Sequence, residues 1–153
     1  PKDVQFDIAS ETGQLPHFNP DLNIQDFPVL GHWVQQMKEC DGLVISTPEY
    51  ARGYPGTLKN ALDWLVQTDA FIEKPFMMLN ASARSTVGRD TLITVIQTMS
   101  GVHIESASTT IPLLGTSHNL DELLAMNEVC TPVQQAMTTF VEAVRSRHPP
   151  GTA

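Results

Sequence analysis

The sequence predicts an α/β fold in which a parallel sheet is doubly wound, with helices on both of its faces. Short apolar runs that suit buried strands alternate along the chain with amphipathic helical patterns. The chain has 153 residues, of which 41% are hydrophobic and 17% are charged. This length and composition are those of one globular domain with a hydrophobic core.

Two strands and two helices are predicted in the first half of the chain. Val4–Ile8 alternates apolar and polar residues, which is typical of a strand with one less-buried face. Asp26 is a suitable N-cap for the first helix. The apolar residues of that helix recur at helical spacing: Leu30, Trp33, Val34 and Met37. Leu43–Ile45 predicts a strand buried on both faces, and Thr57 can cap a second helix that continues to Val66.

The second half begins with a buried strand, Pro75–Asn80, and a small polar loop, Ala81–Gly88. Gly101 ends the helix that follows. The apolar residues of this helix are Leu92, Val95, Ile96 and Met99. We expect the last strand in the middle of segment 103–111, which is rich in Ser and Thr.

A short helix, Asp121–Met126, and a longer terminal helix are predicted near the end of the chain. Thr131-Pro132-Val133-Gln134 is a capping box with Pro at the first helical position, so we expect the terminal helix to begin there. Residues 1–147 are therefore expected to form a single domain, and residues 148–153 a flexible tail.

Charge and composition argue against several classes of function. The chain has 9 Lys and Arg against 17 Asp and Glu, and this net charge of -8 repels the phosphates of a nucleic acid. No apolar run predicts a membrane span and the first residues show no signal-peptide pattern, so we expect a cytoplasmic protein. The histidines lack metal-ligand spacing, so no metal site is predicted. Cys40 and Cys130 are expected to be buried free thiols.

The best candidate for a ligand site is the loop after Leu43–Ile45. In an open parallel sheet, ligands bind at the carboxyl ends of the strands, where Pro48–Tyr54 would lie. Pro48 has no N–H for a ladder and ends the strand, and the glycines and prolines after it turn the chain. From this pattern alone, an ordinary surface turn with an exposed aromatic residue is an equally open alternative.

A longer motif around this loop resembles a known family. Pro48-Glu49-Tyr50, followed by Pro55-Gly56-x-Leu58-Lys59-Asn60-Ala61-Leu62-Asp63-Trp64, resembles the hallmark segment of the NAD(P)H-dependent FMN reductases. Weaker similarity extends over most of the chain. The resemblance implies a flavodoxin-like sheet with the spatial strand order 2-1-3-4-5. The family usually has Asn where this chain has Ala51, and it begins with a strand and a Gly-Ser-x-Arg phosphate loop that this sequence lacks.

The resemblance also implies which residues contact FMN. They are Pro48, Glu49, Tyr50, Ala51, Arg52 and Gly53 in the first loop, and Ser82, Ala83 and Arg84 in a second loop. Backbone N–H groups of the first loop would bond the polar edge of the isoalloxazine ring, and Tyr50 would stack on the ring or shield it. Arg52 or Arg84 would supply positive charge near a phosphate. For the second loop and for both arginines, ordinary solvent exposure is the open alternative.

The implied function is FMN-dependent reduction. NADH or NADPH would reduce the bound flavin, which would then reduce a small-molecule acceptor: a quinone, free flavin, azo dye or metal oxyanion. Because this chemistry belongs mainly to the cofactor, no catalytic side chain is predicted. Two alternatives stay open, an FMN-binding electron carrier without a nicotinamide partner and a flavodoxin-like interaction module that binds no flavin.

Two further expectations concern the oligomeric state and how much of the family's domain this chain contains. We expect a homodimer or homotetramer, with Trp64 buried between subunits because it lies off the core stripe of its helix. Packing of Trp64 within its own chain is an equally open alternative. Val4–Ile8 corresponds to the second strand of the resembling family, so the flavodoxin-like domain would be N-terminally incomplete. We therefore expect the chain to be a fragment that lacks the first strand, phosphate loop and first helix. Val4–Ile8 and Leu43–Ile45 would then stand about 9.5 Å apart, two strand spacings.

Overall fold

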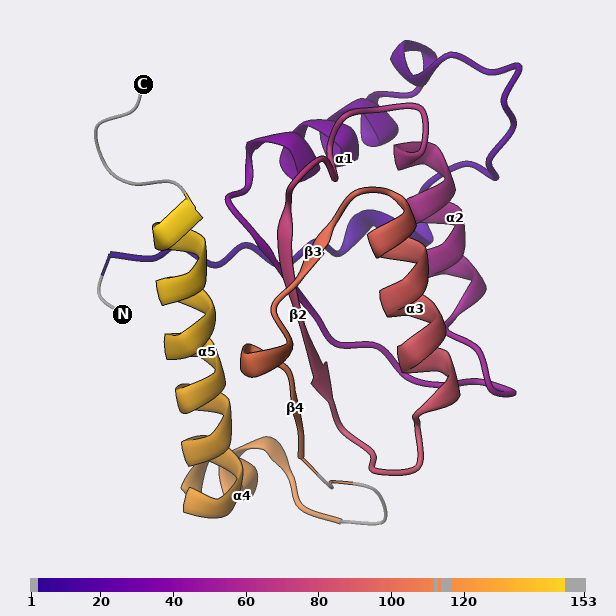
Figure 1. The fold of residues 1–153 in the computed structure, drawn as a ribbon. Helices are drawn as coiled ribbons and strands as arrows, with labels where there is room; N and C mark the ends of the chain where they lie inside the picture. The colour runs from indigo at the N-terminus through magenta and orange to yellow at the C-terminus, as the bar shows by residue number, and fades with distance from the viewer. Residues whose placement is uncertain (1–2, 112, 114–116, 148–153) are drawn as a thin grey trace.

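The structure is a computed structural model that describes residues 3–111, 113 and 117–147 (Figure 1). Its strands are β1 (Leu43–Ile45), β2 (Pro75–Asn80), β3 (Val102–His103) and β4 (Thr109–Thr110). Its α-helices are α1 (Pro28–Glu39), α2 (Gly56–Leu65), α3 (Val87–Thr98), α4 (Leu120–Ala125) and α5 (Asn127–Arg147). Three short 3₁₀ helices are η1 (Glu11–Gly13), η2 (Ile24–Asp26) and η3 (Glu105–Ala107). The predicted tail, residues 148–153, lies outside the described residues.

The sheet is built around β2. β1 pairs in parallel with one edge of β2, with Leu43 opposite Phe76 and Ile45 opposite Met78. On the other edge, the start of β2 pairs with β3 and its end pairs with β4, both in parallel. The predicted α/β fold with a parallel sheet is therefore confirmed.

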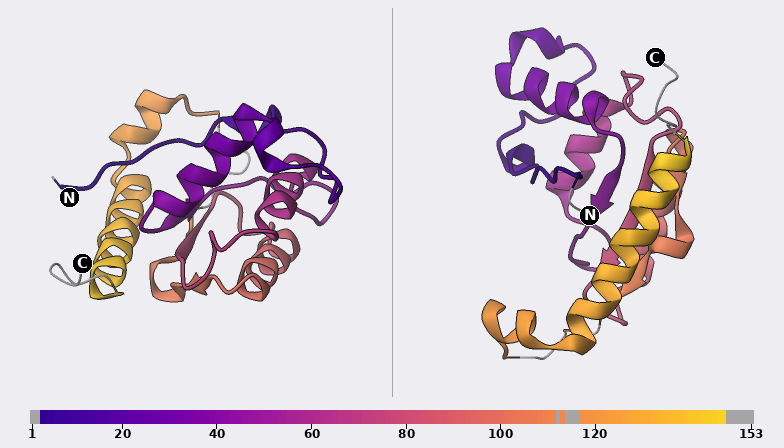
Figure 2. Two further views of the ribbon diagram at one scale, coloured as in Figure 1. Left: turned by 90° about the horizontal axis from the view of Figure 1, so that it is seen from above. Right: turned by 90° about the vertical axis from the view of Figure 1, so that its left-hand side faces the viewer.

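Side chains of β2 enter two cores, because successive residues of a strand point to opposite faces. Phe76 and Met78 pack into the larger core with residues of α1, α2 and α3. Met77 packs into the smaller core with residues of α5. Figure 2 shows α5 lying apart from the other long helices, across the sheet. A Cβ at Gly42 would lie 2.9 Å from Phe140 Cζ, so glycine there lets α5 approach the chain just before β1.

The predicted strand at Val4–Ile8 is wrong. The segment forms no strand, and two of its three apolar side chains are exposed, Phe6 to 54% and Ile8 to 89%. Alternation makes a strand only where a neighbour completes the hydrogen-bond ladder. Within the described residues, β1 pairs only with β2, and no backbone hydrogen bond joins β1 to Val4–Ile8.

The last strand is interrupted rather than continuous. β3 and β4 are separated by η3, and the Oγ atom of Ser108 accepts the hydrogen bond of Met78 N–H at 3.0 Å. Normal pairing continues on either side, where Ile104 N donates to Phe76 O and Ile111 N donates to Asn80 O, both at 2.8 Å. A serine hydroxyl thus replaces one backbone acceptor of the ladder.

The predicted helices are present, but several of them begin at other residues than predicted. The short helix near residue 121 is confirmed as α4, and all four residues of the predicted α1 stripe are buried. The predicted caps are wrong, because the N-cap positions are Phe27 in α1 and Pro55 in α2, and neither makes a side-chain cap bond. The terminal helix begins at Asn127, before Pro132, so the capping-box start is also wrong.

Trp64 is buried within its own chain and not in a subunit interface. Its side chain is fully buried in the larger core, and its Nε1–H donates to Pro16 O at 2.8 Å. The ring meets Phe18 edge-on, with centroids 5.1 Å apart. Asn60 Nδ2 also donates to Pro16 O, at 2.9 Å. The predicted interface role of Trp64 is therefore wrong, because the loop around Pro16 covers it.

The two thiols are free but half-buried rather than buried. Burial raises the pKa of the Cys40 thiol, although nearby Lys74 opposes the shift. Among the described residues, no group of three His, Cys, Asp or Glu side chains is placed to hold a metal ion. No described helix combines the length and apolar character needed to cross a bilayer.

Candidate functional site

Two loops meet at the carboxyl edge of the sheet. One follows β1 and leads into α2, and the other follows β2 and leads into α3. Because β1 and β2 are paired in parallel, both loops leave the sheet at the same edge. This edge is where ligands bind in open α/β sheets. The structure thus brings together the two loops that contain all nine predicted site residues.

The first loop is folded into a tight turn at Tyr50–Gly53. Tyr50 N–H donates to Gly53 O at 2.8 Å, and Gly53 N–H donates to Tyr50 O at 2.9 Å. The two residues between them have positive φ, 50° at Ala51 and 63° at Arg52. Positive φ at both central residues is the type I′ geometry, which favours Gly, Asn and Asp, because the Cβ of other residues clashes with the backbone there. Ala51 and Arg52 therefore hold a strained conformation.

This turn decides which backbone donors are available to a ligand. The N–H of Tyr50 is used inside the turn, so it cannot serve the predicted role. In the described part of the chain, the N–H groups of Glu49, Ala51 and Arg52 have no hydrogen-bond partner. The Tyr50 side chain is 66% exposed beside them. The loop therefore offers three donors and one exposed aromatic ring.

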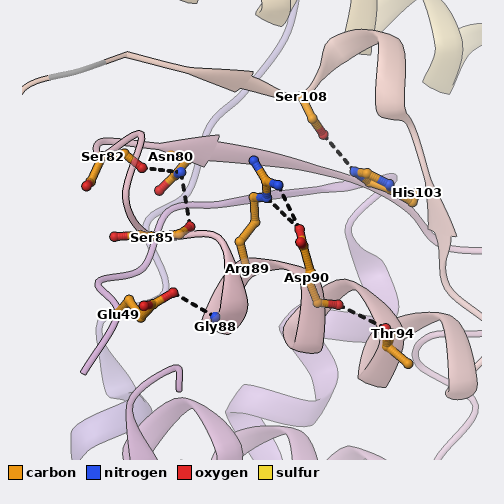
Figure 3. Close-up of polar contacts among 10 residues, drawn as sticks. All are labelled: Glu49, Asn80, Ser82, Ser85, Gly88, Arg89, Asp90, Thr94, His103 and Ser108. Carbon is orange, nitrogen blue, oxygen red and sulfur yellow. Dashed lines mark hydrogen bonds and ion pairs between the residues drawn. The ribbon is translucent and has the colours of Figure 1, made fainter. Parts of the chain in front are cut away.

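The second loop is organised by Asn80, which sequence reasoning missed. Asn80 is buried, and its Nδ2 donates to Ser82 O at 2.6 Å and to Ser85 O at 3.3 Å (Figure 3). Arg84 N–H donates to Ser82 Oγ at 3.2 Å, which tightens the same turn. The sequence does contain a signal for this role, because Asn80 is a polar residue at the end of an otherwise apolar buried strand. Ala83 and Arg84 are exposed and Ser82 is half-buried at the tip of this loop.

The two loops are joined directly. Glu49 Oε2 accepts a hydrogen bond from Gly88 N–H at 2.7 Å, a contact that spans 39 residues (Figure 3). Gly88 lies in the first turn of α3 and is buried. A Cβ at this position would lie 3.0 Å from Glu49 Cγ and 3.1 Å from Gly53 C. No local sequence pattern predicts this contact, since its two partners belong to different loops.

A narrow crevice of about 10 Å³ lies between the loops. Pro48 and Glu49 line one side, and Asn80, Ser85 and Arg89 line the other. Cofactor pockets usually measure about 300–1,000 Å³, so a ring system would have to rest on the outer surface of the loops. Arg89 also pairs with Asp90, Nη2 to Oδ1 at 2.8 Å.

Three arginines lie at this edge of an acidic chain, together with the carboxylates of Glu49 and Asp90. The exposed side chains of Arg52 and Arg84 lie in the two loops, and Arg89 lies in the crevice. Farther along the sheet, His103 Nε2 is 2.8 Å from Ser108 Oγ, and the His103 ring stacks on Phe76. Burial lowers the pKa of His103; Glu105 opposes this shift and Arg89 adds to it.

Comparisons with known proteins show which sequences and structures this chain is similar to. The sequence model of the NADPH-dependent FMN reductase family matches residues 2–116, which include both loops. The chain is 48% identical over 65 residues to a 2-hydroxy-1,4-benzoquinone reductase from Burkholderia sp, covering 42% of this chain and 34% of that protein. It is 30% identical over 110 residues to an NADPH azoreductase from Bacillus sp. (strain OY1-2), covering 72% of this chain and 60% of that protein.

A solved structure has the same fold. It is FerB, a flavoenzyme NAD(P)H:(acceptor) oxidoreductase from Paracoccus denitrificans, with a TM-score of 0.76 and 21% sequence identity. The match covers 88% of this chain and 78% of FerB, and it supports a flavodoxin-like fold. The present chain spans only about a third to three fifths of the length of the two curated relatives.

Proposed function

This chain belongs to the NADPH-dependent FMN reductase family, and we propose that it functions in an FMN-dependent NAD(P)H oxidoreductase. The reaction would pass electrons from NADH or NADPH to a small-molecule acceptor. The names of its relatives, a benzoquinone reductase and an azoreductase, favour quinones and azo compounds among the acceptors. Free flavins and metal oxyanions stay in the proposal as further acceptors.

The observation that carries this proposal is the pair of joined loops at the carboxyl edge of β1 and β2. The backbone N–H groups of Glu49, Ala51 and Arg52, which have no partner among the described residues, are available to an acceptor-bearing ligand. The polar edge of an isoalloxazine ring carries such acceptors, so the donor set fits FMN. Bound FMN would supply hydride and electron transfer between the nicotinamide and the acceptor.

The residues of this chain would bind and orient rather than react. Contacts are proposed from the first loop (Pro48, Glu49, Tyr50, Ala51, Arg52 and Gly53) and from the second (Ser82, Ala83 and Arg84). The backbone of the first loop would fix the ring edge, and the exposed Tyr50 ring would cover an apolar face and exclude water. Arg52 and Arg84 would attract the phosphates of the cofactor or the nicotinamide.

A homodimer or homotetramer in the cytoplasm belongs to the same proposal. Trp64 is not its contact, but α4 carries two exposed leucines one turn apart, Leu120 at 69% and Leu124 at 64% exposure. Light scattering at micromolar concentration tests this part, and a monomer would remove it.

The main test uses the purified chain mixed with FMN. We expect quenching of flavin fluorescence on binding and, without oxygen, bleaching of the flavin absorption when NADH or NADPH is added. A benzoquinone or an azo dye should then restore the absorption. Binding without bleaching would support an electron carrier instead. Because this sequence lacks the family's phosphate loop, we expect weak affinity for FMN, and only a lack of binding at high FMN concentration would favour an interaction module.

A further inference from the structure

We propose that the Glu49 side chain is a positioning residue that holds the two flavin loops in one fixed arrangement. Its carboxylate reaches from the first loop to the N-terminus of α3, which directly follows the second loop. This inference rests on the proposed function, because it assigns a role in FMN binding. The proposed function uses the backbone N–H of Glu49 to bind the flavin. The inference goes beyond it, because it gives the Glu49 side chain a separate role.

The N-terminus of α3 lacks a cap from its own chain segment. Thr86 occupies the N-cap position but makes no side-chain cap bond. The first N–H groups of a helix have no intrahelical acceptor, and a side chain commonly bonds the second or third of them. Gly88 is the second residue of α3, and its N–H is bonded by Glu49 Oε2 at 2.7 Å. Glu49 therefore acts as an N-cap from a distant loop, and its negative charge suits the positive end of the helix dipole.

Gly88 makes the contact possible. Its φ does not lie in the left-handed region, so backbone conformation does not require glycine here. The requirement is space, because a Cβ would press on Glu49 Cγ at 3.0 Å and on the backbone carbon of Gly53 at 3.1 Å. Both are parts of the first loop. The two loops are thus packed as well as bonded together.

The contact controls the donors that would face the flavin. Glu49 directly precedes the Tyr50–Gly53 turn, whose free N–H groups are at Ala51 and Arg52. Anchoring the Glu49 side chain to α3 fixes the start of this turn relative to the second loop. Without the anchor, the first loop would lose its only side-chain hydrogen bond to α3 among the described residues. The free N–H groups of the first loop would then no longer be held at a fixed distance from the second loop.

The test compares Glu49→Ala, Glu49→Gln and the unsubstituted chain. Gln keeps an acceptor oxygen at nearly the same position, so it should retain the link. Glu122→Ala is a matched control, because Glu122 also caps a helix, accepting from Asn119 N–H at 2.9 Å in α4. Two measurements are made on each protein, the hydrogen-exchange rate of the Gly88 amide without ligand and the Kd for FMN.

Loss of a helix cap should speed exchange at Gly88 about 2- to 30-fold in Glu49→Ala. The Kd for FMN should rise about tenfold in the same variant, while Glu49→Gln should restore both values to within about threefold. Glu122→Ala should change neither. Unchanged exchange in Glu49→Ala, no rescue by Gln, or faster exchange with an unchanged Kd would each overturn the positioning role.

If the proposed FMN-dependent function is wrong, the outcome differs from that expected when only the positioning role is wrong. In that case the unsubstituted chain itself would not bind FMN, whatever Glu49 does. Exchange at Gly88 would still report whether the carboxylate links the loops, but its assigned role in flavin binding would be rejected.

Discussion

The indole Nε1–H of Trp64 donates a hydrogen bond to the carbonyl oxygen of Pro16 at 2.8 Å, across 48 residues of sequence. The same oxygen accepts from Asn60 Nδ2 at 2.9 Å, and Asn60 Oδ1 accepts from Phe18 N–H at 2.7 Å. Two side chains of α2 therefore hold the loop around Pro16 over the larger core. The motif that resembles the reductase hallmark thus includes residues with a structural role as well as residues of the candidate site.

Trp64→Phe should lower the free energy of unfolding by about 1–2 kcal/mol, because it removes one buried hydrogen bond and some volume. Pro16 O would keep its bond from Asn60. Trp33→Phe is the matched control, since Trp33 is buried in the same core but has a longer bond, Nε1 to Ala61 O at 3.3 Å. Urea unfolding measures both losses. A loss that depends on protein concentration would contradict the burial of Trp64 within one chain.

Ala51→Gly should raise the free energy of unfolding by about 0.5–1 kcal/mol, because glycine adopts a positive φ without a Cβ clash. Ala51→Asn should give a smaller gain, since Asn tolerates this region better than Ala. Ala83→Gly, in the second loop, is the control and should give no gain, because Ala83 has no positive φ. Thermal unfolding of the three variants provides the measurement. A destabilised Ala51→Gly would mean that the Tyr50–Gly53 turn is not of the type described.

Gly88→Ala should destabilise the protein by about 1–3 kcal/mol, because the new methyl group would press on Glu49 and Gly53. Gly31→Ala makes the same change in α1 at a position with no atom within 4 Å of the new Cβ. It should stabilise the protein by up to about 1 kcal/mol through helix propensity. Chemical unfolding measures the change in unfolding free energy for both variants. Equal changes in the two would contradict the close packing of Gly88 against the first loop.

Stability should depend on pH through His103. Burial, the largest cause, lowers the pKa of His103 from its ordinary value of 6.5 in the folded chain. The unfolded chain then binds the proton more tightly, so the contribution of this residue is complete above pH 6.5. It is lost as the pH falls below 6.5 toward the folded pKa. His103→Asn should therefore flatten the fall in unfolding free energy over this range; an identical slope would contradict the assignment.

The sequence predicted elements that depend on local pattern. The strands β1 and β2 and the stripe of α1 follow directly from apolar spacing. The predicted burial of β1 on both faces is wrong, because Leu43 and Ile45 are half-buried and Val44 is 36% exposed. Val4–Ile8 has an equally good strand pattern but forms none, because pairing depends on a neighbour that local pattern does not reveal. Trp64 was misplaced for a similar reason, since the loop that covers it lies far away in sequence.

The candidate site remains a prediction, and its first loop was proposed because the motif Pro48-Glu49-Tyr50 is contiguous in sequence. The contacts that build the site join separate segments, as in the bond from Gly88 to Glu49. The positive φ at Ala51 gives a physical reason for the Asn usually found there in the resembling family, but only the structure reveals that conformation.

The most direct test of the central claim is to follow backbone amide signals by NMR while FMN is added to the isotope-labelled chain. We predict that the largest changes occur at Glu49, Ala51 and Arg52, with smaller ones at Ser82, Ala83 and Arg84. Tyr50 N–H, which is bonded within its turn, should shift less than its neighbours. Absence of binding, or changes centred away from the two loops, for example on α5, would contradict the account.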